Sequence, residues 1–238
     1  MRWTEAVVLG LAVWGSVLAQ SAPQTQPAQQ ASPVPSAQAN TGQFVVVIDA
    51  AHGGTDAGAG LGNGLAEKNV TLALSVRLRS TLQARGVNVV TTREADATLP
   101  ALNRAEAANH AQAAVCLVLH ATATGSGVHL YTAALAPAAQ THPLSWPTAQ
   151  AGYVTQSVKL ESEIDSAMAH AQIPVTLGRA SVQPMDNLAC PAVAVEMAPL
   201  VAGHITGGKG ISDTGYQETV VNALAAAVES WRSDWKQP

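Results

Sequence analysis

Four residues capable of metal binding or acid–base chemistry stand where segments of the chain change character. His52 follows the apolar run FVVVIDA, His120 ends AAVCLVLH, and Glu196 lies near the end of PAVAVEMAPL. Glu67 comes after a glycine-rich loop, at the start of an amphipathic segment. Two imidazoles and a carboxylate that leave one position open are the usual ligand set of a catalytic zinc site, and a second carboxylate outside that set can act as a base.

Each of these residues also has a plainer explanation. A single His after a strand is more often structural, and a Glu at the start of a helix commonly interacts with the helix dipole. Glu196 is the hardest to explain in this way. An unpaired carboxylate inside VAVEMA would lose on the order of several kcal/mol of hydration unless a cation or hydrogen-bond donors compensated it. The joint arrangement therefore favours a functional site.

The loop between His52 and Glu67 is rich in glycine. We expect these glycines to adopt positive φ and to allow close approach of the backbone, because side chains would crowd the entrance. They are Gly53, Gly54, Gly58, Gly60, Gly62 and Gly64. A phosphate-binding loop is the alternative, but no GK[ST] follows, the spacing does not match GxGxxG, and the loop is acidic.

The elements that must position these residues follow from the hydrophobic pattern. The predicted strands are 44–50, 87–93, 113–120, 127–133 and 191–200, and the predicted helices are 68–85, 99–112, 152–171 and 213–231. A short strand and a turn are expected within 175–187. Strands that alternate with helices predict a single α/β domain with a mixed, mostly parallel twisted sheet and helices on both faces. Ligands bind such sheets beyond the carboxyl ends of the strands, where the four residues lie.

Composition limits the class of protein and of partner. The 238 residues suit one domain of about 200 residues with extensions. A net charge of −4, without a run of Lys or Arg, argues against nucleic acid as a partner.

The first part of the chain has the features of an export signal. Met1 and Arg2 carry positive charge, an apolar run follows, and VLA precedes Gln20 as a cleavage site. We therefore predict a signal peptide at 1–19, a disordered linker rich in Pro, Gln, Ala and Ser at 20–42, and a folded domain at 43–238. The expected location is the periplasm or cell envelope, with no integral membrane span after cleavage of the signal. An uncleaved anchor or a buried helix is the alternative for the apolar run.

The chain has two cysteines, Cys116 and Cys190, each in or beside a predicted core strand. Export would permit a disulfide between them, but the sequence does not show whether their Cα atoms lie close enough. Two buried thiols remain the alternative.

Six spaced segments together resemble a known family. The order IDAAHGGxDxG, GLAEKNV, TTREAD, NRAEAAN, VCLVLHATA and PAVAVEMAPL is similar to that of the zinc-dependent N-acetylmuramoyl-L-alanine amidases, in the amidase type 3 catalytic domain. The resemblance covers residues 43 to 235. It implies that His52, Glu67 and His120 bind one zinc ion and that Glu196 is the catalytic carboxylate. The implied substrate is peptidoglycan, cleaved between the lactyl group of N-acetylmuramic acid and L-alanine.

The sequence departs from the family pattern at three places. The family usually has Pro-Gly before its first His, where this chain has Ala50 and Ala51. It usually has Asn two residues after its third ligand, where Thr122 stands here, and Gly-Phe after its catalytic Glu, where Met197 and Ala198 stand. No ligand is removed, and we expect the departures to affect contacts in the substrate groove and the level of activity.

Two arginines are candidates for binding a substrate carboxylate. Arg93 and Arg104 could each do so bidentately. The alternative is a structural ion pair with Asp96 or Glu106, which lie nearby in the sequence.

Other residues are expected in supporting roles. Asp49 and Asp56 could orient the ligand imidazoles, with a salt bridge or a turn as the alternative role. His129, His142 and His204 are expected at the surface, with His204 the candidate for lining the groove.

Some members of the family carry a long helical insertion that covers the zinc site until a partner removes it. The corresponding stretch here, 133–150, is short and contains three prolines. We therefore predict no built-in plug. The sequence does not identify an activator or divisome partner.

Two other functions remain open. One is a non-catalytic cell-wall-binding protein of the same fold, and the other is a zinc peptidase or carboxypeptidase that acts on another amide.

Overall fold

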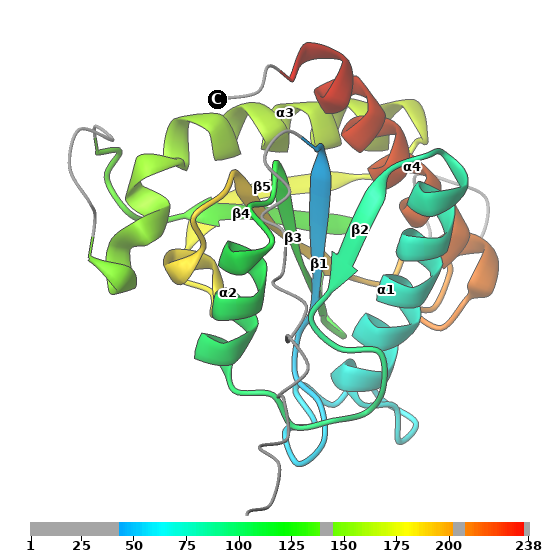
Figure 1. Ribbon diagram of the computed structural model, residues 1–238. Helices are drawn as coiled ribbons and strands as arrows, with labels where there is room; N and C mark the ends of the chain where they lie inside the picture. Colours follow the sequence, from blue (N-terminus) through cyan, green and yellow to red (C-terminus); the bar gives the residue numbers. More distant parts are fainter. Residues whose placement is uncertain (1–42, 139–144, 202–207, 236–238) are drawn as a thin grey trace, which may run out of the picture. The chain divides into compact units, whose positions relative to one another are not determined.

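The computed structural model describes residues 43–138, 145–201 and 208–235. They form one six-stranded sheet with helices on both faces, which confirms the predicted α/β fold class (Figure 1). The predicted signal peptide at 1–19 and linker at 20–42 lie outside the described residues. Within the described ranges, no helix has the length and apolar content needed to cross a membrane.

The elements follow the predicted order closely. They are β1 (Val45–Ala50), α1 (Glu67–Ala84), β2 (Asn88–Thr91), α2 (Ala101–His110), β3 (Val115–Ala121), β4 (Val128–Ala133), η1 (Trp146–Gly152), α3 (Val154–His170), β5 (Val175–Ala180), η2 (Met185–Asn187), β6 (Ala192–Met197) and α4 (Thr214–Asp234). The strand and turn expected within 175–187 are β5 and the 3₁₀ turn η2. A second 3₁₀ segment, η1, lies where a proline-broken loop was expected.

The strand order determines which strand ends meet. The sheet runs β2-β1-β3-β6-β4-β5. The first four of these strands are parallel, whereas β4 and β5 are parallel to each other and β4 is antiparallel to β6. The beginning of β4 therefore lies beside the carboxyl end of β6, at the same edge of the sheet as the carboxyl end of β3.

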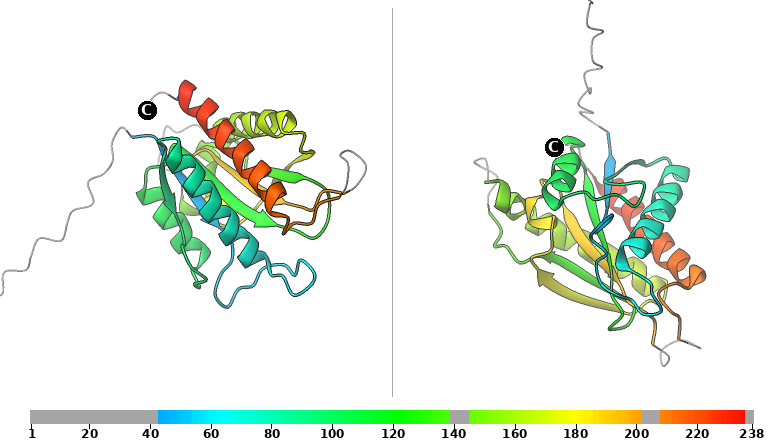
Figure 2. Two further views of the ribbon diagram at one scale, coloured as in Figure 1. Left: turned by 90° about the vertical axis from the view of Figure 1, so that its right-hand side faces the viewer. Right: turned by 90° about the horizontal axis from the view of Figure 1, so that it is seen from below.

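The two faces of the sheet are buried against different helices. On one face, Ile48, Leu117 and Val195 share a core cluster with residues of α1, α3 and α4. Figure 2 (left) shows α1 and α4 side by side over this face. On the other face, Val118 and Ala194 pack with residues of α2 and η2. Both faces of the strands are covered, which explains their continuous apolar sequences.

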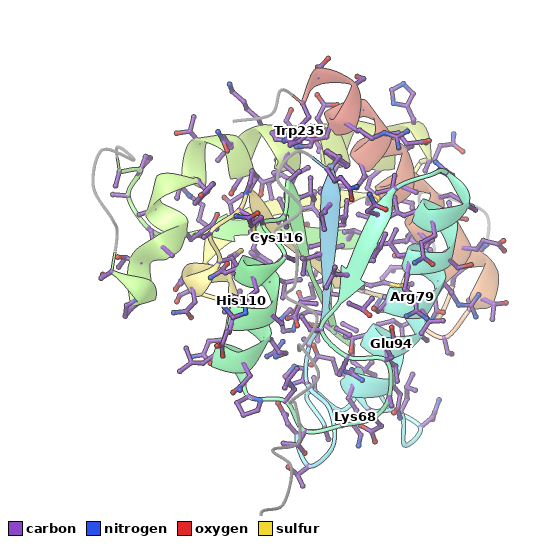
Figure 3. The ribbon with its side chains drawn as sticks, viewed as in Figure 1. Lys68, Arg79, Glu94, His110, Cys116 and Trp235 are labelled. Atoms are coloured by element: carbon purple, nitrogen blue, oxygen red, sulfur yellow. A yellow bond between two sulfur atoms is a disulfide. The ribbon has the colours of Figure 1, made fainter. Side chains whose placement is uncertain are left out.

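A disulfide joins Cys116 and Cys190, whose Cα atoms are 6.1 Å apart. Cys116 lies in β3, near the middle of the sheet (Figure 3), and Cys190 lies two residues before β6 begins. The disulfide therefore links β3, which carries His120, to the segment that leads into β6, which carries Glu196. It answers the question that the sequence left open.

Candidate metal centre

His52 is held immediately after the end of β1. Its backbone has φ of 64°, in the left-handed region that non-glycine residues seldom adopt. Arg93 secures the preceding turn, because its guanidinium donates to the carbonyl oxygens of Ala50 and Ala51 at 2.9 and 3.1 Å. The Nδ1 atom of His52 lies 2.8 Å from Oδ2 of Asp56, which fixes the orientation of the ring. This contact fits both the orienting role considered for Asp56 and the salt bridge that was its alternative, and Oδ1 of Asp56 also accepts from the backbone N–H of Gly58 at 3.1 Å, as in a turn.

Glu67 begins α1 and is anchored by the glycine-rich loop. Its backbone N–H donates to the carbonyl of Ala59 at 2.9 Å, which satisfies one of the free donors at the helix start. Its carboxylate accepts hydrogen bonds from the backbone N–H groups of Ala59 and Ala121, at 2.8 and 3.1 Å. It also lies 3.1 Å from Nε2 of His52 and 2.8 Å from Nδ1 of His120.

These contacts set the charges at the site. Burial alone would raise the pKa of Glu67, but the hydrogen bonds from His120, His52 and the two amides outweigh it and lower that pKa. The hydrogen bond to Glu67 raises the pKa of His52, aided by Asp56 and opposed by burial. Glu67 is therefore an anion at neutral pH, facing two imidazoles.

The donor set fits a divalent metal ion. One ligand atom from each of His52, Glu67 and His120 lies within 4.8 Å of the other two. Two imidazole nitrogens and a carboxylate oxygen are typical zinc ligands and leave a fourth position open. Within the described ranges, Nε2 of His120 is buried and has no hydrogen-bond partner, so only His52 has its second nitrogen oriented by a neighbour. The structure thus brings the three predicted ligands together as a cluster that could hold a metal.

Glu196 lies one strand away from this cluster. It is in register with His120 of β3 on one side and with His129 of β4 on the other. Residues paired in this way project from the same face, and neighbouring strands are about 4.8 Å apart. The Glu196 side chain is 27% exposed. A carboxylate is therefore placed beside the candidate metal cluster and is open to solvent.

The prediction that His129 lies at the surface was wrong. Its side chain is 13% exposed, and its Nδ1 atom lies 2.8 Å from Oε2 of Glu196. The alternation in VHLYTA places His129 and Tyr131 on the same face, but the sequence does not show that β4 runs antiparallel to β6. That reversal brings the start of β4 to the site. His142 and His204 lie outside the described residues.

The predicted partners of the two arginines were also wrong. Arg93 binds backbone carbonyls rather than Asp96, whose carboxylate instead pairs with Lys68 at 2.7 Å. Arg104 forms a buried ion pair with Asp49 rather than with Glu106. Asp49 consequently belongs to this ion pair, and no imidazole of the described residues contacts its carboxylate.

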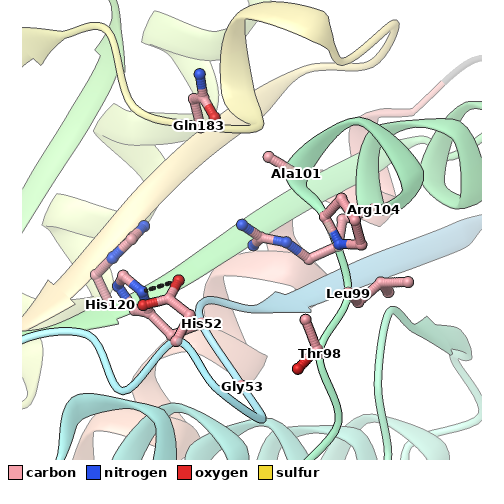
Figure 4. A pocket seen from close by; sticks show the side chains of 10 residues that line it. His52, Gly53, Thr98, Leu99, Ala101, Arg104, His120 and Gln183 are labelled. Atoms are coloured by element: carbon pink, nitrogen blue, oxygen red, sulfur yellow. Dashed lines mark hydrogen bonds and ion pairs between the residues drawn. The ribbon is translucent and has the colours of Figure 1, made fainter.

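A pocket of about 440 Å³ opens beside the cluster. Figure 4 shows His52 and His120 at one end and Arg104 directed toward them from α2. Gln183 and the residues that lead into α2 complete the lining. The cluster is therefore open on the α2 side to a cavity large enough for part of a substrate.

One glycine of the loop is packed directly against the cluster. Gly58 has φ of +66°, and a Cβ atom there would lie 2.6 Å from Cδ2 of His52 and 2.7 Å from Oε2 of Glu67. Gly60, Gly62 and Gly64 face open space. The close packing of backbone against neighbouring groups, expected along the whole loop, thus occurs only in its first part. Gly58 is the glycine of this loop that packs against two predicted ligands.

The family model described as N-acetylmuramoyl-L-alanine amidase matches residues 46–230. The chain belongs to this amidase family. Among curated relatives, it is 39% identical over 87 residues to the amidase AmiA of Escherichia coli strain K12, covering 37% of this chain and 30% of that protein. It is 32% identical over 117 residues to AmiC of Neisseria meningitidis serogroup B, covering 47% of this chain and 28% of that protein. These matches span less than a third of either relative.

Solved amidase structures share the fold. The catalytic domain of CwlV from Bacillus (Paenibacillus) polymyxa superposes with a TM-score of 0.62 at 23% identity, over 80% of this chain and 99% of that one. Ami1 from Mycobacterium smegmatis gives a TM-score of 0.63 at 19% identity, over 82% and 100%. The described fold is therefore that of an amidase catalytic domain.

Most departures from the amidase family pattern lie in the core. Ala50, Ala51, Met197 and Ala198 are each 0% exposed. These four side chains can therefore affect the substrate groove only through the packing beneath it, and their expected effect on activity stays a prediction. Thr122 is partly exposed and remains a candidate for a groove contact. The predicted absence of a plug stays a prediction, because 139–144 lies outside the described residues.

Proposed function

We propose that this protein hydrolyses the amide bond between the lactyl group of N-acetylmuramic acid and L-alanine in peptidoglycan, with one zinc ion as cofactor. The observation that carries the proposal is the meeting of His52, Glu67 and His120 beside an open pocket. Membership of the amidase family supplies the substrate class.

The residues divide into a metal-holding set and a proton-transfer group. His52, Glu67 and His120 would hold the zinc ion through two imidazole nitrogens and a carboxylate. When bound there, the zinc ion would supply Lewis acidity toward the scissile carbonyl and would make a water molecule easier to deprotonate. Glu196 takes a proton from the attacking water and delivers it to the nitrogen of the leaving L-alanine. Both imidazoles must be neutral to bind metal, so activity falls on acidification.

The cellular location follows from the sequence and agrees with the disulfide. A signal peptide at 1–19 would export the chain to the periplasm or cell envelope, where peptidoglycan is found. The disulfide between Cys116 and Cys190 supports this location, because disulfides persist in oxidising compartments.

The test is incubation of the protein with purified peptidoglycan, followed by identification of the released peptides. We expect stem peptides with a free L-alanine amino group, and we expect release to stop with a chelator and return with zinc. Binding without release would indicate a non-catalytic wall-binding protein. Cleavage at another amide would indicate a zinc peptidase. Release that survives Glu196→Gln would contradict the assigned role of Glu196.

A further inference from the structure

The carboxylate of Glu196 is held by one of its two oxygens. His129 Nδ1 lies 2.8 Å from Oε2, and the Tyr131 hydroxyl donates to the same oxygen at 3.4 Å. Within the described ranges, no hydrogen bond reaches Oε1. The shorter contact, from His129, is the stronger of the two. The carboxylate therefore has one tethered oxygen and one that is free to exchange a proton.

The imidazole that makes this contact is itself fixed. The backbone of His129 is held in β4 between Val128 and Leu130, whose side chains are fully buried on the opposite face of the sheet. The loop before β4 packs against its ring, because a Cβ atom added to Gly125 would lie 2.4 Å from both Cε1 and Nε2. Gly125 has φ of +86°, a conformation that favours glycine. The ring is thus confined between the preceding loop and Glu196, on a strand whose backbone is held by its buried neighbours.

We propose that His129 is a positioning residue that holds Glu196 through Oε2 and leaves Oε1 to transfer the proton during amide hydrolysis. This inference rests on the proposed role of Glu196. In the reaction, one proton of water passes to Oε1 as the water oxygen bonds to the carbonyl carbon. The same proton then passes from Oε1 to the amide nitrogen as the carbon–nitrogen bond breaks. His129 retains its Nδ1 proton throughout, so its contribution is orientation.

The physical benefit comes from the exposure of Glu196. Its side chain is 27% exposed and would otherwise rotate among several conformers at the end of β6. A base must lie within hydrogen-bonding distance of the proton that it removes. The hydrogen bond from His129 selects a carboxylate orientation before the substrate arrives, which reduces the entropy lost in reaching the transition state.

The experiment compares two variants of similar shape, His129→Asn and His129→Leu. Asn retains an N–H donor close to the position of Nδ1, whereas Leu has none. With a soluble muramoyl peptide as substrate, we expect the Leu variant to lose about 10- to 100-fold in kcat, the usual effect of removing a residue that orients a reacting group. KM and zinc content should stay within about twofold of the wild type. The Asn variant should recover most of the loss.

Two further variants separate this inference from the proposed function. His170→Leu is the matched control, since His170 is an exposed imidazole on α3 whose Nδ1 contacts a carbonyl of its own helix; its activity should be unchanged. Combining His129→Leu with Glu196→Gln should cost no more than Glu196→Gln alone, because His129 acts through Glu196.

The outcomes lead to different conclusions. Full kcat in His129→Leu, with Glu196→Gln inactive, would overturn the positioning role and leave the proposed function intact. Equal losses in the Asn and Leu variants, compared where circular dichroism shows both folded, would also overturn it. Full activity of Glu196→Gln would remove the proposed role of Glu196 and this inference with it.

Discussion

Two buried glutamates in this domain have pKa values shifted in opposite directions. Glu67 at the candidate metal centre and Glu161 on α3 are 5% and 8% exposed. Four hydrogen-bonding groups surround the Glu67 carboxylate and lower its pKa despite burial. Oε1 of Glu161 is buried without a partner within the described ranges, and burial raises the pKa of Glu161 to about 7, against a weaker opposing effect of Arg179.

The difference shows that partners, rather than depth, decide the charge of a buried carboxylate. Both residues lie on helices that pack against the same sheet. Glu67 lies at the end of α1 that faces the carboxyl edge of the strands, where imidazoles and free backbone donors converge. Glu161 lies within α3, where the backbone donors are already used by the helix. A buried carboxylate that stays charged among imidazoles therefore indicates a functional site more strongly than burial alone.

The largest expected effect comes from removing the charge at Glu67. Glu67→Gln should abolish zinc retention and lower amidase activity by more than about 100-fold. Mutating a residue that only orients a metal ligand already lowers metal affinity or activity by about 10- to 100-fold, and Glu67 would be a ligand itself. Glu161→Gln is the matched control and should keep wild-type zinc content. Metal analysis and peptidoglycan release measure both. Equal zinc content in the two variants would contradict the claim that Glu67, unlike Glu161, binds the metal.

The second prediction concerns crowding at Glu67. A methyl group at position 58 would lie 2.6 Å from His52 and 2.7 Å from Glu67, so Gly58→Ala should lower zinc affinity by about 10-fold or more. Gly60→Ala is the control in the same loop, since nothing lies within 4 Å of its added Cβ. Zinc titration of the two metal-free proteins compares them. Wild-type zinc affinity in Gly58→Ala would contradict this prediction, because the loop would then have shifted to accommodate the methyl group without moving His52 or Glu67.

The third prediction concerns stability rather than metal binding, and its effect at Glu161 depends on pH. Its pKa of about 7 in the folded protein is above the ordinary 4.5, so the unfolded chain ionises first as the pH rises. Wild-type stability is then lost between these two values, whereas a Gln variant has no such loss. Glu161→Gln should match the wild type near pH 4 and exceed it by roughly 1 to 3 kcal/mol near pH 8. Urea unfolding at both pH values measures the difference in the free energy of unfolding. A difference between the two proteins that is the same at both pH values would contradict the raised pKa of Glu161.

Much of the fold was predictable because the sheet is covered on both faces. Its strands are continuous apolar runs, and its helices have apolar residues at regular spacing, so local pattern and tertiary environment agree. The meeting of His52, Glu67 and His120 was predictable for a related reason. Parallel strands place their carboxyl ends at one edge, and Glu67 begins the helix that follows.

The remaining features depend on pairings between distant segments. The role of His129 requires the antiparallel register of β4 against β6, which alternation within one strand does not specify. The ion pair of Arg104 with Asp49 joins a helix to the strand beneath it, whereas the expected partner of Arg104 was close in sequence. The disulfide likewise depends on the distance between β3 and the segment before β6, which are far apart in the sequence.

The most direct test of the account is anomalous diffraction at the zinc absorption edge from crystals of the zinc-loaded protein. We predict one peak per chain, located among His52 Nε2, the Glu67 carboxylate and His120, with the Glu196 carboxylate on the same side of the sheet. A peak elsewhere, or no peak at this cluster in a protein that releases stem peptides, would contradict the central claim.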